Sequence, residues 1–244
     1  MLIKVADITK YFGIVPKSIL HIGAHTAEEK GDYEIAGWAS IGIIWVEAQE
    51  ELCKIIPIRE NTNDKVLNCL AWNQNGKEIE FKITNSGQSS SLLDFGTHEK
   101  TYPDINFIAK KTLRSVRLDS LLNEKDNFDL INIDVQGVER EALEGLGNLI
   151  TKVNYIYSEV NNEQVYQNCT IVKDLDLFLK QFGFKRVVTK WVQGAGWGDA
   201  LYIYAPSTKI LITGSILSII YLLKNLRDFV LFKIIKIIKI FKVK

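Results

Sequence analysis

Runs of apolar residues alternate with amphipathic stretches along most of the chain. Several of the apolar runs are nearly continuous in Ile, Val and Leu, which is typical of strands that are covered on both faces. The runs that predict strands are residues 18–23, 42–47, 65–70, 128–135, 153–160, 184–191 and 200–205. The stretches between them have helical spacing; after Thr170, for example, apolar residues recur on one face until Gly183 ends the pattern. This regular alternation of strands and helices predicts an α/β fold with a doubly wound sheet.

Residues 76–118 interrupt the alternation. The segments KEIEFKIT and LRSVRLD alternate apolar and polar residues without an intervening helical stretch. Period-two alternation is the pattern of half-buried antiparallel strands. We therefore expect an antiparallel β insertion in the domain, with the serine-rich segment NSGQSSS (85–91) as a flexible turn.

The composition is that of an ordinary globular protein, since 47% of the 244 residues are hydrophobic and 24% are charged. We divide the chain into an N-terminal extension (1–16), one domain (17–206) and a basic, hydrophobic C-terminal tail (207–244). Charged residues interrupt the first apolar stretch, so we expect no signal peptide. Three widely separated cysteines match neither a disulfide framework nor a metal site, which indicates reduced thiols in a cytoplasmic compartment. They are Cys53, Cys69 and Cys169.

The near-neutral net charge of +1 conceals an asymmetry. Residues 209–244 carry eight basic side chains and one acid, Asp228, a net charge of +7; the other 208 residues carry 22 basic and 28 acidic groups, a net charge of −6. The main body therefore lacks the basic balance that duplex nucleic acid requires, and we expect no nucleic-acid partner.

The tail combines this charge with many isoleucines. Its longest uncharged run, residues 210–223, has 14 residues, whereas a bilayer core requires a helix of about 20 residues. Lysines then recur at every third position, which spreads them over a broad helical face. We therefore expect peripheral attachment of residues 209–244 to an anionic membrane surface rather than a spanning helix. Packing of the tail against the body or against another subunit is the alternative.

The first strand leads into a loop with the sequence SILHIGAHTAEE (18–29). It has one glycine, Gly23, where the dinucleotide fingerprint has three. A Thr-x-x-Glu capping box (Thr26, Glu29) predicts a helix that begins just after His25 and directs its first amides at a ligand.

Two consecutive acids, Glu28 and Glu29, fall in the first turn of that expected helix. Their charges would repel a pyrophosphate that approached the same end. S-adenosylmethionine fits better, because it carries a sulfonium, an ammonium and a single carboxylate.

Acidic residues stand at the ends of three other predicted strands. Glu47 lies twenty-four residues after Gly23, where a carboxylate accepts hydrogen bonds from ribose hydroxyls in both NAD and adenosylmethionine folds. Asp134 and Glu159 end two neighbouring strands, where they could orient a substrate hydroxyl, take its proton or hold a metal. Glu139, in the first turn of the helix that follows, could instead bond loop amides.

Six segments resemble the FkbM family of S-adenosylmethionine-dependent methyltransferases. They are ILHIGAHTAEE, IIWVEAQEEL, LDSLL, DLINIDVQGVEREALEGL, YSEVNNEQVY and GWGDALYIY, in this order from about residue 17 to 205. The resemblance implies an α/β class I methyltransferase (Rossmann-like) fold, in which a seven-stranded sheet has an antiparallel last strand. It also implies methyl transfer to an oxygen, typically of a sugar, a glycan or a small hydroxylated metabolite.

The resemblance also implies which residues contact the cofactor. Gly23 and its neighbours would hold the methionine part, Glu47 the ribose, and the segment around Leu70 the adenine. The full set expected at the cofactor is His21, Gly23, Ala24, His25, Glu47, Ala48, Leu70, Ala71 and Asp134. The sequence departs from the family pattern at Ala27, where a second loop glycine is usual, and at Gln136, where a glutamate is usual. The second departure removes a charge and weakens a metal or base role for this motif.

Methyl transfer requires little chemistry from the protein beyond alignment and removal of the hydroxyl proton. We expect Asp134 to be the base, with Glu159 as the second choice. We expect no metal, because His21 lies on the strand and His25 on the turn. His98 has no evident partner, and Trp191 and Trp197 could form a substrate lid or pack a turn. The alternatives for the whole protein are an NAD-dependent oxidoreductase and a non-catalytic scaffold with the same fold.

Overall fold

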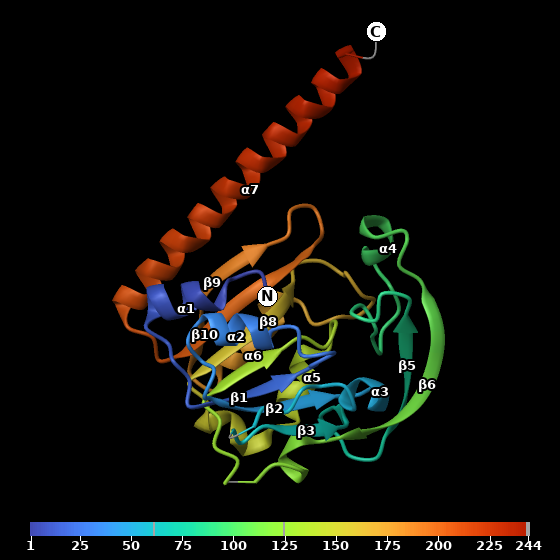
Figure 1. The fold of residues 1–244 in the computed structure, drawn as a ribbon, viewed down its shortest axis with the longest axis vertical. Coiled ribbons are helices and arrows are strands. Elements are labelled where there is room, and N and C mark those ends of the chain that lie inside the picture. Colours follow the sequence, from blue (N-terminus) through green and yellow to red (C-terminus); the bar gives the residue numbers. More distant parts are fainter. Residues whose placement is uncertain (61, 124, 243–244) are drawn as a thin grey trace.

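A seven-stranded sheet forms the centre of the molecule. We describe residues 1–60, 62–123 and 125–242 from a computed structural model, with side chains as far as Phe229. The strand order is β3-β2-β1-β7-β8-β10-β9 (Figure 1). The bounds in that order are Lys65–Asn68, Gly42–Glu47, Ser18–Ile22, Leu130–Ile133, Tyr155–Asn161, Trp197–Tyr204 and Phe184–Trp191.

The first five strands in this order are parallel, and β10 is antiparallel to both β8 and β9. The predicted doubly wound sheet with an antiparallel last strand is therefore confirmed. Near-continuous apolar runs give these strands because both faces of the sheet are covered.

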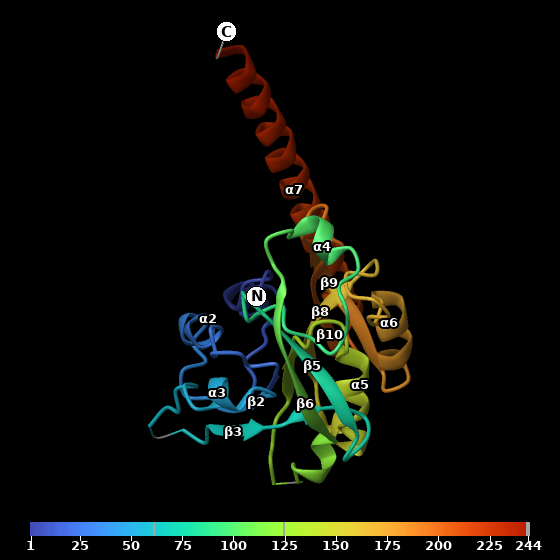
Figure 2. The ribbon, with the colours of Figure 1, turned by 90° about the vertical axis from the view of Figure 1, so that its right-hand side faces the viewer.

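Side chains alternate between two cores along each strand. On β1, Leu20 and Ile22 face the core shared with α5 (Glu139–Glu144) and α6 (Val172–Lys180). Ile19 faces the other core, shared with α1, α2 and α7. These three helices are Val5–Phe12, Lys30–Ile35 and Thr208–Lys242. Figure 2 shows α5 and α6 on one side of the sheet and α2 on the other.

The insertion also has the expected form. β5 (Glu78–Thr84) pairs antiparallel with β6 (Phe107–Val116), which also pairs with β4 (Leu70–Ala71). The long connection from β5 to β6 includes a short helix, α4 (His98–Thr101). The serine-rich turn was expected to be flexible, but part of it is packed. Ser90 and Ser91 are buried, and their side chains hydrogen-bond to backbone groups of Thr84 and Gln136.

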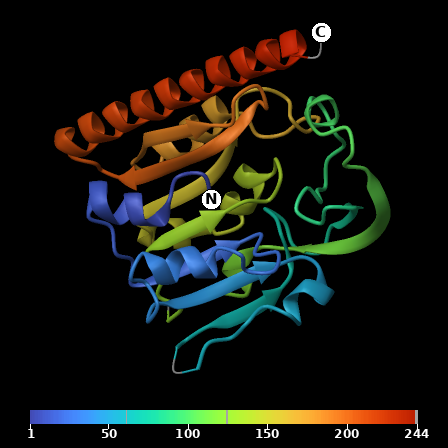
Figure 3. The same cartoon turned by 45° about the horizontal axis from the view of Figure 1, so that its top comes forward.

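The remaining short elements are α3 (Glu50–Cys53) and two 3-10 helices, η1 (Leu118–Ser120) and η2 (Gly147–Lys152). η1 and η2 pack into the core shared with α5 and α6, whereas α3 lies on the same side of the sheet as α2 (Figure 2). The longest helix is α7. α7 begins against the body and then extends beyond it (Figures 1 and 3).

Candidate active site

Two adjoining pockets open at the carboxyl ends of β1, β2, β7 and β8. This edge is where ligands bind in open α/β sheets. The first pocket encloses about 590 Å³ and the second about 1420 Å³, both including space open to solvent. They share five lining residues, which are Gly23, His25, Gln88, Asp134 and Gln136. The pockets therefore meet at these residues, where a ligand in one pocket can contact a ligand in the other.

The first pocket is a mainly apolar slot with one carboxylate at its side. Its apolar wall comes from the strands, from the insertion and from the residue before α5, and includes Val46, Leu70, Ala71, Phe81, Leu92 and Val138. The carboxylate is that of Glu47, at the end of β2. Its Oε2 accepts the His25 amide at 2.9 Å, and its Oε1 accepts the Gln49 amide at 2.8 Å. Burial raises the pKa of Glu47 despite these hydrogen bonds.

The loop after β1 approaches β7 very closely at Gly23. This residue has φ +85°, and a Cβ atom on it would lie 1.8 Å from the carbonyl oxygen of Asp134. No side chain can occupy that position, so the glycine is required by contact as well as by backbone conformation.

The prediction of a helix that begins after His25 is wrong. Helix α2 begins at Lys30, and Thr26 makes no capping hydrogen bond. His25 and Ala27 instead adopt positive φ angles of 46° and 61°, and the His25 amide is bonded to Glu47. Because Ala27 stands in this left-handed region, the structure explains why glycine is usual at its position.

His25 connects this loop to the insertion. Its Nδ1 lies 2.7 Å from Oε1 of Glu28, and the same oxygen accepts a hydrogen bond from the side-chain Nε2 of Gln88 at 3.3 Å. Partial burial alone would raise the pKa of Glu28, but hydrogen bonds from the backbone, His25 and Gln88 lower it to about 2. Glu28 therefore keeps a negative charge at the mouth of the second pocket.

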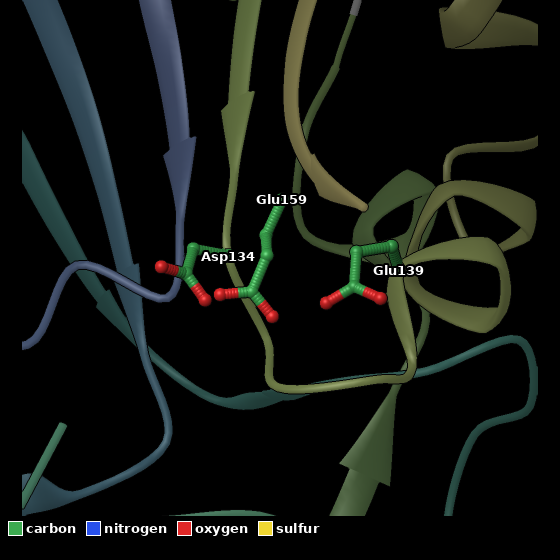
Figure 4. Close-up of side chains that lie close together, drawn as sticks. All are labelled: Asp134, Glu139 and Glu159. Atoms are coloured by element: carbon green, nitrogen blue, oxygen red, sulfur yellow. The ribbon is translucent and has the colours of Figure 1, made fainter. Parts of the chain in front are cut away.

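Four carboxyl groups gather where the two pockets meet. Oxygen atoms of Asp134, Glu139 and Glu159 lie within 4.8 Å of one another (Figure 4). Asp199 of β10 is directly opposite Glu159 in the sheet register. Desolvation deep in the crevice and the charge of Asp199 raise the pKa of Asp134 to about 7, although its side chain is open to the cavity. Burial, with Asp134 and Glu139 nearby, raises the pKa of Glu159 well above its ordinary value.

Glu139 serves the loop between β7 and α5. Its Oε1 accepts the amides of Gly137 at 3.0 Å and Val135 at 3.3 Å, and its side chain is almost fully buried. Burial raises its pKa to about 7. The interpretation that Glu139 bonds loop amides therefore agrees with its contacts, and we assign it to positioning the loop.

Gln136 stands between the other two carboxylates. Its amide nitrogen donates to Asp134 and, at 3.4 Å, to Glu159. Its Oε1 accepts the hydroxyl of Tyr166 at 2.6 Å. The departure from the family's glutamate thus replaces a fifth acidic group in this cluster with a neutral donor, which lowers the pKa of Asp134.

The second pocket has acidic and aromatic walls. Its carboxylates are those of Glu28, Glu29, Asp134, Glu159 and Asp199, and its rings include those of His98, Tyr102, Tyr166 and Trp197. Among the described residues that line either pocket there is no Lys or Arg. A phosphate would therefore face several carboxylates here, with the N-terminal ammonium of Met1, 3.8 Å from Oε1 of Glu29, as a positive group in the described lining.

His98 has partners that the sequence did not reveal. Its Nε2 lies 3.2 Å from Oγ of Ser89, and its ring stacks on Phe95 with centroids 4.4 Å apart. Nearby, the indole of Trp197 donates to the hydroxyl of Tyr102 at 3.1 Å. These contacts join α4 of the insertion to β10, so that both form one wall of the second pocket.

The structure divides the expected cofactor residues between the pockets. Most line the first pocket, namely Gly23, His25, Glu47, Ala48, Leu70, Ala71 and Asp134. His21 lines the second pocket instead, where burial lowers its pKa to about 3 and its Nδ1 bonds the hydroxyl of Tyr33. Ala24 is fully buried and lines neither, although its amide donates to the Val46 carbonyl. Of the two expected catalytic acids, Asp134 lines both pockets and Glu159 lines the second.

Sequence reasoning missed several lining residues. Phe81 and Leu92 come from the insertion, and only the alternation in KEIEFKIT gave a signal for the first of them. Asp199 interrupts an apolar strand, which is the signal that could have identified it. Trp191 lines neither pocket and contacts α7 through its carbonyl.

A family model described as the methyltransferase FkbM domain matches residues 21–186, well over half of the chain. The chain belongs to the FkbM methyltransferase family. Gly23, the Glu47 carboxylate and the acidic loop after β7 all fall inside the matched range.

Individual proteins resemble this chain only at low sequence identity or over part of its length. The 2-O-methyltransferase NoeI of Sinorhizobium fredii is 30% identical over 81 residues, which cover 32% of this chain and 33% of NoeI. The solved structure of an FkbM methyltransferase from Methylobacillus flagellatus is similar with a TM-score of 0.50 and 14% identity, over 77% of this chain and 43% of that one. The structure of a putative tRNA (m1A22) methyltransferase of Streptococcus pneumoniae, solved with S-adenosyl-L-methionine, is similar with a TM-score of 0.47 and 15% identity. The match covers 93% of this chain and 88% of that one. The matches thus span about a third of NoeI and less than half of the Methylobacillus protein.

S-adenosylmethionine is the cofactor of the FkbM methyltransferases, and the first pocket fits it. The apolar slot suits adenine, and Glu47 has oxygen lone pairs available for ribose hydroxyls. Asp134, at the junction of the pockets, places negative charge where a sulfonium can be accommodated. The pyrophosphate of NAD has no Lys or Arg partner among the described lining residues, which disfavours the oxidoreductase alternative.

Proposed function

We propose that this chain transfers a methyl group from S-adenosylmethionine to a hydroxyl of a neutral, sugar-like acceptor. The observation that carries the proposal is the position of Asp134, which lines both pockets. A cofactor in the first pocket and an acceptor in the second would meet at this carboxylate. Holding the two reactants in contact supplies most of the catalysis that methyl transfer requires.

Asp134 is the base in this proposal. When bound, the cofactor supplies an activated methyl group. The acceptor hydroxyl must lose its proton as its oxygen is methylated, and Asp134 accepts that proton. With a pKa of about 7, Asp134 is substantially ionised near neutrality and is still basic enough to accept the proton of the hydroxyl. Burial raises the pKa of Glu159 well above its ordinary value, and in its protonated form this group can donate a hydrogen bond to another acceptor oxygen.

The lining of the second pocket supports a neutral polyhydroxylated acceptor. Carboxyl groups accept hydrogen bonds from sugar hydroxyls, and aromatic rings pack against the apolar faces of sugar rings. The pocket supplies both kinds of group, with Tyr102 and Trp197 on one wall and Glu159 and Asp199 on another. The five carboxylates disfavour phosphorylated acceptors and nucleic acids. NoeI, the relative at 30% identity, is named as a 2-O-methyltransferase, which agrees with a hydroxyl acceptor.

The test is methyl transfer from labelled S-adenosylmethionine to an array of neutral glycans, their phosphorylated counterparts and small hydroxylated metabolites. We expect labelled product with neutral acceptors and little with phosphorylated ones. Asp134→Asn should lower the rate by about 100-fold or more, as removal of a catalytic base does. Asp32→Asn, on the exposed surface of α2, is the matched control. Equal rates for the wild type and Asp134→Asn would contradict the role of the base, and transfer to nitrogen acceptors alone would contradict the proposed reaction. Cofactor binding without transfer to any acceptor would favour the non-catalytic scaffold.

We also infer that residues 209–244 attach the protein peripherally to an anionic membrane surface. The +7 charge of this segment supports attraction to anionic lipid. By length and composition, Thr208–Phe229 is the one helix in the described part of the chain that could cross a membrane. Its packing on the body, described below, favours attachment over crossing. Membrane fractions washed with alkaline carbonate test this: a peripheral protein is released, whereas retention in the pellet would indicate a spanning helix.

A further inference from the structure

Helix α7 covers the free edge of the sheet along β9. The backbone amide of Thr189 donates to Oγ of Ser218 at 3.1 Å, and the side-chain Nδ2 of Asn225 donates to the carbonyl of Trp191 at 2.8 Å. At Gly214 the helix approaches so closely that a Cβ atom would lie 1.9 Å from the carbonyl oxygen of Val187. These contacts protect an edge strand that would otherwise expose unpaired backbone groups. They also fix the rotation of α7 about its axis.

The contacts come from one stripe of the helix, which we call the docking stripe: Gly214, Leu217, Ser218, Tyr221 and Asn225. At about 100° per residue these positions lie on the same side of the helix. The opposite side is a second stripe, which we call the outer stripe: Ile212, Ile216, Ile219, Ile220, Leu223 and Leu226. Each of its side chains is 47–59% exposed. Six large aliphatic residues thus form a continuous apolar surface with no protein against it in the described structure.

The charge of the tail identifies what covers the outer stripe. An apolar helical face flanked by many basic residues is the pattern of a helix that lies in the interface of an anionic membrane. The docking stripe is held by the body, so Thr208–Asn225 cannot be surrounded by lipid on all sides. A bilayer that contacts only the outer stripe satisfies both observations.

The same helix lies next to the wall of the second pocket. Asn225 hydrogen-bonds to Trp191, the last residue of β9. Trp191 pairs with Gly198 of β10, and Trp197, the residue before Gly198, lines the pocket. From Asn225 the helix continues to Lys242, about 25 Å further at 1.5 Å per residue. Figure 3 shows this part extending past the β9–β10 turn on the side of α4, and Figure 2 shows it rising above α4. A membrane on α7 would therefore lie close to the pocket wall formed by Tyr102 and Trp197.

We propose that the outer stripe of α7 docks the protein on anionic membranes and that the acceptor is a glycan anchored in the same membrane. The second part rests on the proposed function, because it assumes that a hydroxyl acceptor enters the second pocket. Docking through a helix that is rigidly attached beside the pocket confines enzyme and acceptor to one surface. This raises their effective concentration without any new contact at the site.

Docking is tested by flotation with vesicles of phosphatidylcholine and phosphatidylglycerol (7:3) and of phosphatidylcholine alone. The full chain is compared with Ile216→Glu/Leu223→Glu in the outer stripe and with Ile35→Glu/Ile108→Glu, a matched pair of exposed apolar residues elsewhere. We expect the wild type and the matched pair to float with anionic vesicles, and the outer-stripe variant to lose at least 10-fold of this binding. Adenosylhomocysteine binding by each variant confirms that the domain is folded. Equal flotation of all three proteins, or failure of the wild type to float, would overturn docking. A change of oligomeric state in the outer-stripe variant without any vesicle binding by the wild type would assign the stripe to a second copy of the chain.

The acceptor is tested with neutral glycolipids in the same anionic vesicles and with their glycans released by deacylation. We expect the wild type to methylate the vesicle-borne form at least 10-fold faster, and the outer-stripe variant to lose this advantage while its rate on released glycans stays unchanged. Equal wild-type rates on both forms would overturn the membrane-anchored acceptor and leave the proposed function intact. Absence of transfer to either form, with adenosylhomocysteine still bound, would overturn both.

Discussion

The hydroxyl of Tyr166 donates to Oε1 of Gln136 at 2.6 Å, and this contact turns the amide nitrogen of Gln136 toward Asp134 and Glu159. Burial raises the pKa of Tyr166, so its hydroxyl remains a donor at any physiological pH. The pair therefore places one neutral donor between two acids that would repel each other if both were ionised. This arrangement keeps Asp134 ionisable near neutrality.

Replacement of Gln136 by Glu should shift the pH dependence of methyl transfer upward. The variant loses the amide that stabilises ionised Asp134 and adds a like charge beside it, so the pKa of Asp134 rises above about 7. Because the base must be ionised, half-maximal rate should require a pH higher by about one unit. Tyr166→Phe, which frees the amide to rotate, should give a smaller shift in the same direction. Superimposable pH–rate profiles for all three proteins would show that Gln136 does not act on the base.

Glu47→Ala should weaken cofactor binding. The loss of hydrogen bonds to a charged group corresponds to roughly 1–3 kcal/mol, or about 5- to 150-fold in the dissociation constant for adenosylhomocysteine. Glu47→Gln should fall between the wild type and Glu47→Ala, since an amide oxygen can still accept from His25 or from a ribose. Glu51→Ala is the control, because Glu51 lies on exposed α3 and pairs only at the surface with Lys111. Titration calorimetry measures all four proteins, and an unchanged affinity in Glu47→Ala would remove this residue from the site.

Much of the fold can be predicted from the sequence, because strands that are covered on both faces consist of nearly continuous runs of apolar residues. β2 and β9 have the predicted bounds to the residue. The start of α2 could not be found in this way. A capping box depends on local backbone conformation, and here His25 and Ala27 adopt left-handed conformations since a distant carboxylate, that of Glu47, binds the loop.

The acid cluster should make stability depend on pH. The raised pKa values of Asp134 and Glu139, both about 7, mean that the folded protein binds more protons than the unfolded chain between about pH 4 and pH 7. The stability that these groups contribute is therefore present in acid and is lost as the pH rises through 7. Asp134→Asn should melt about 2–4 °C above the wild type at pH 8, the shift that about 1 kcal/mol gives in a chain of this size, and the difference should narrow at pH 5. A wild-type melting temperature that rises steadily from pH 5 to pH 8 would contradict the clustering of protonated acids.

Gly23→Ala should disrupt the loop between the pockets. The added methyl would overlap the carbonyl of Asp134, and φ +85° is unfavourable for alanine. We expect destabilisation of about 2 kcal/mol or more, together with loss of adenosylhomocysteine binding. Gly31→Ala in α2 is the matched control, since its added methyl meets nothing within 4 Å and alanine favours a helix. Denaturant unfolding compares the two variants, and wild-type stability and affinity in Gly23→Ala would contradict the close contact.

The site was less predictable than the fold. The strand-end positions identified Glu47 and Asp134 because the carboxyl ends of parallel strands meet at one edge. Pairing across an antiparallel sheet brings Asp199 to Glu159, and the connection from β5 to β6 brings His98 to the second pocket. Both depend on chain pairing over long sequence distances, which local patterns do not encode. The tail shows the same limit: packing of its helix on the body was the alternative, but no local pattern indicated β9 as the strand that it contacts.

The central claim is that the first pocket is an adenosylmethionine site, and titration calorimetry with adenosylhomocysteine and NAD side by side tests it most directly. The apolar slot, Glu47 and the lack of Lys and Arg among the described lining residues predict binding of adenosylhomocysteine and no measurable binding of NAD. Binding of NAD without adenosylhomocysteine would contradict the account and assign the pocket to a dinucleotide.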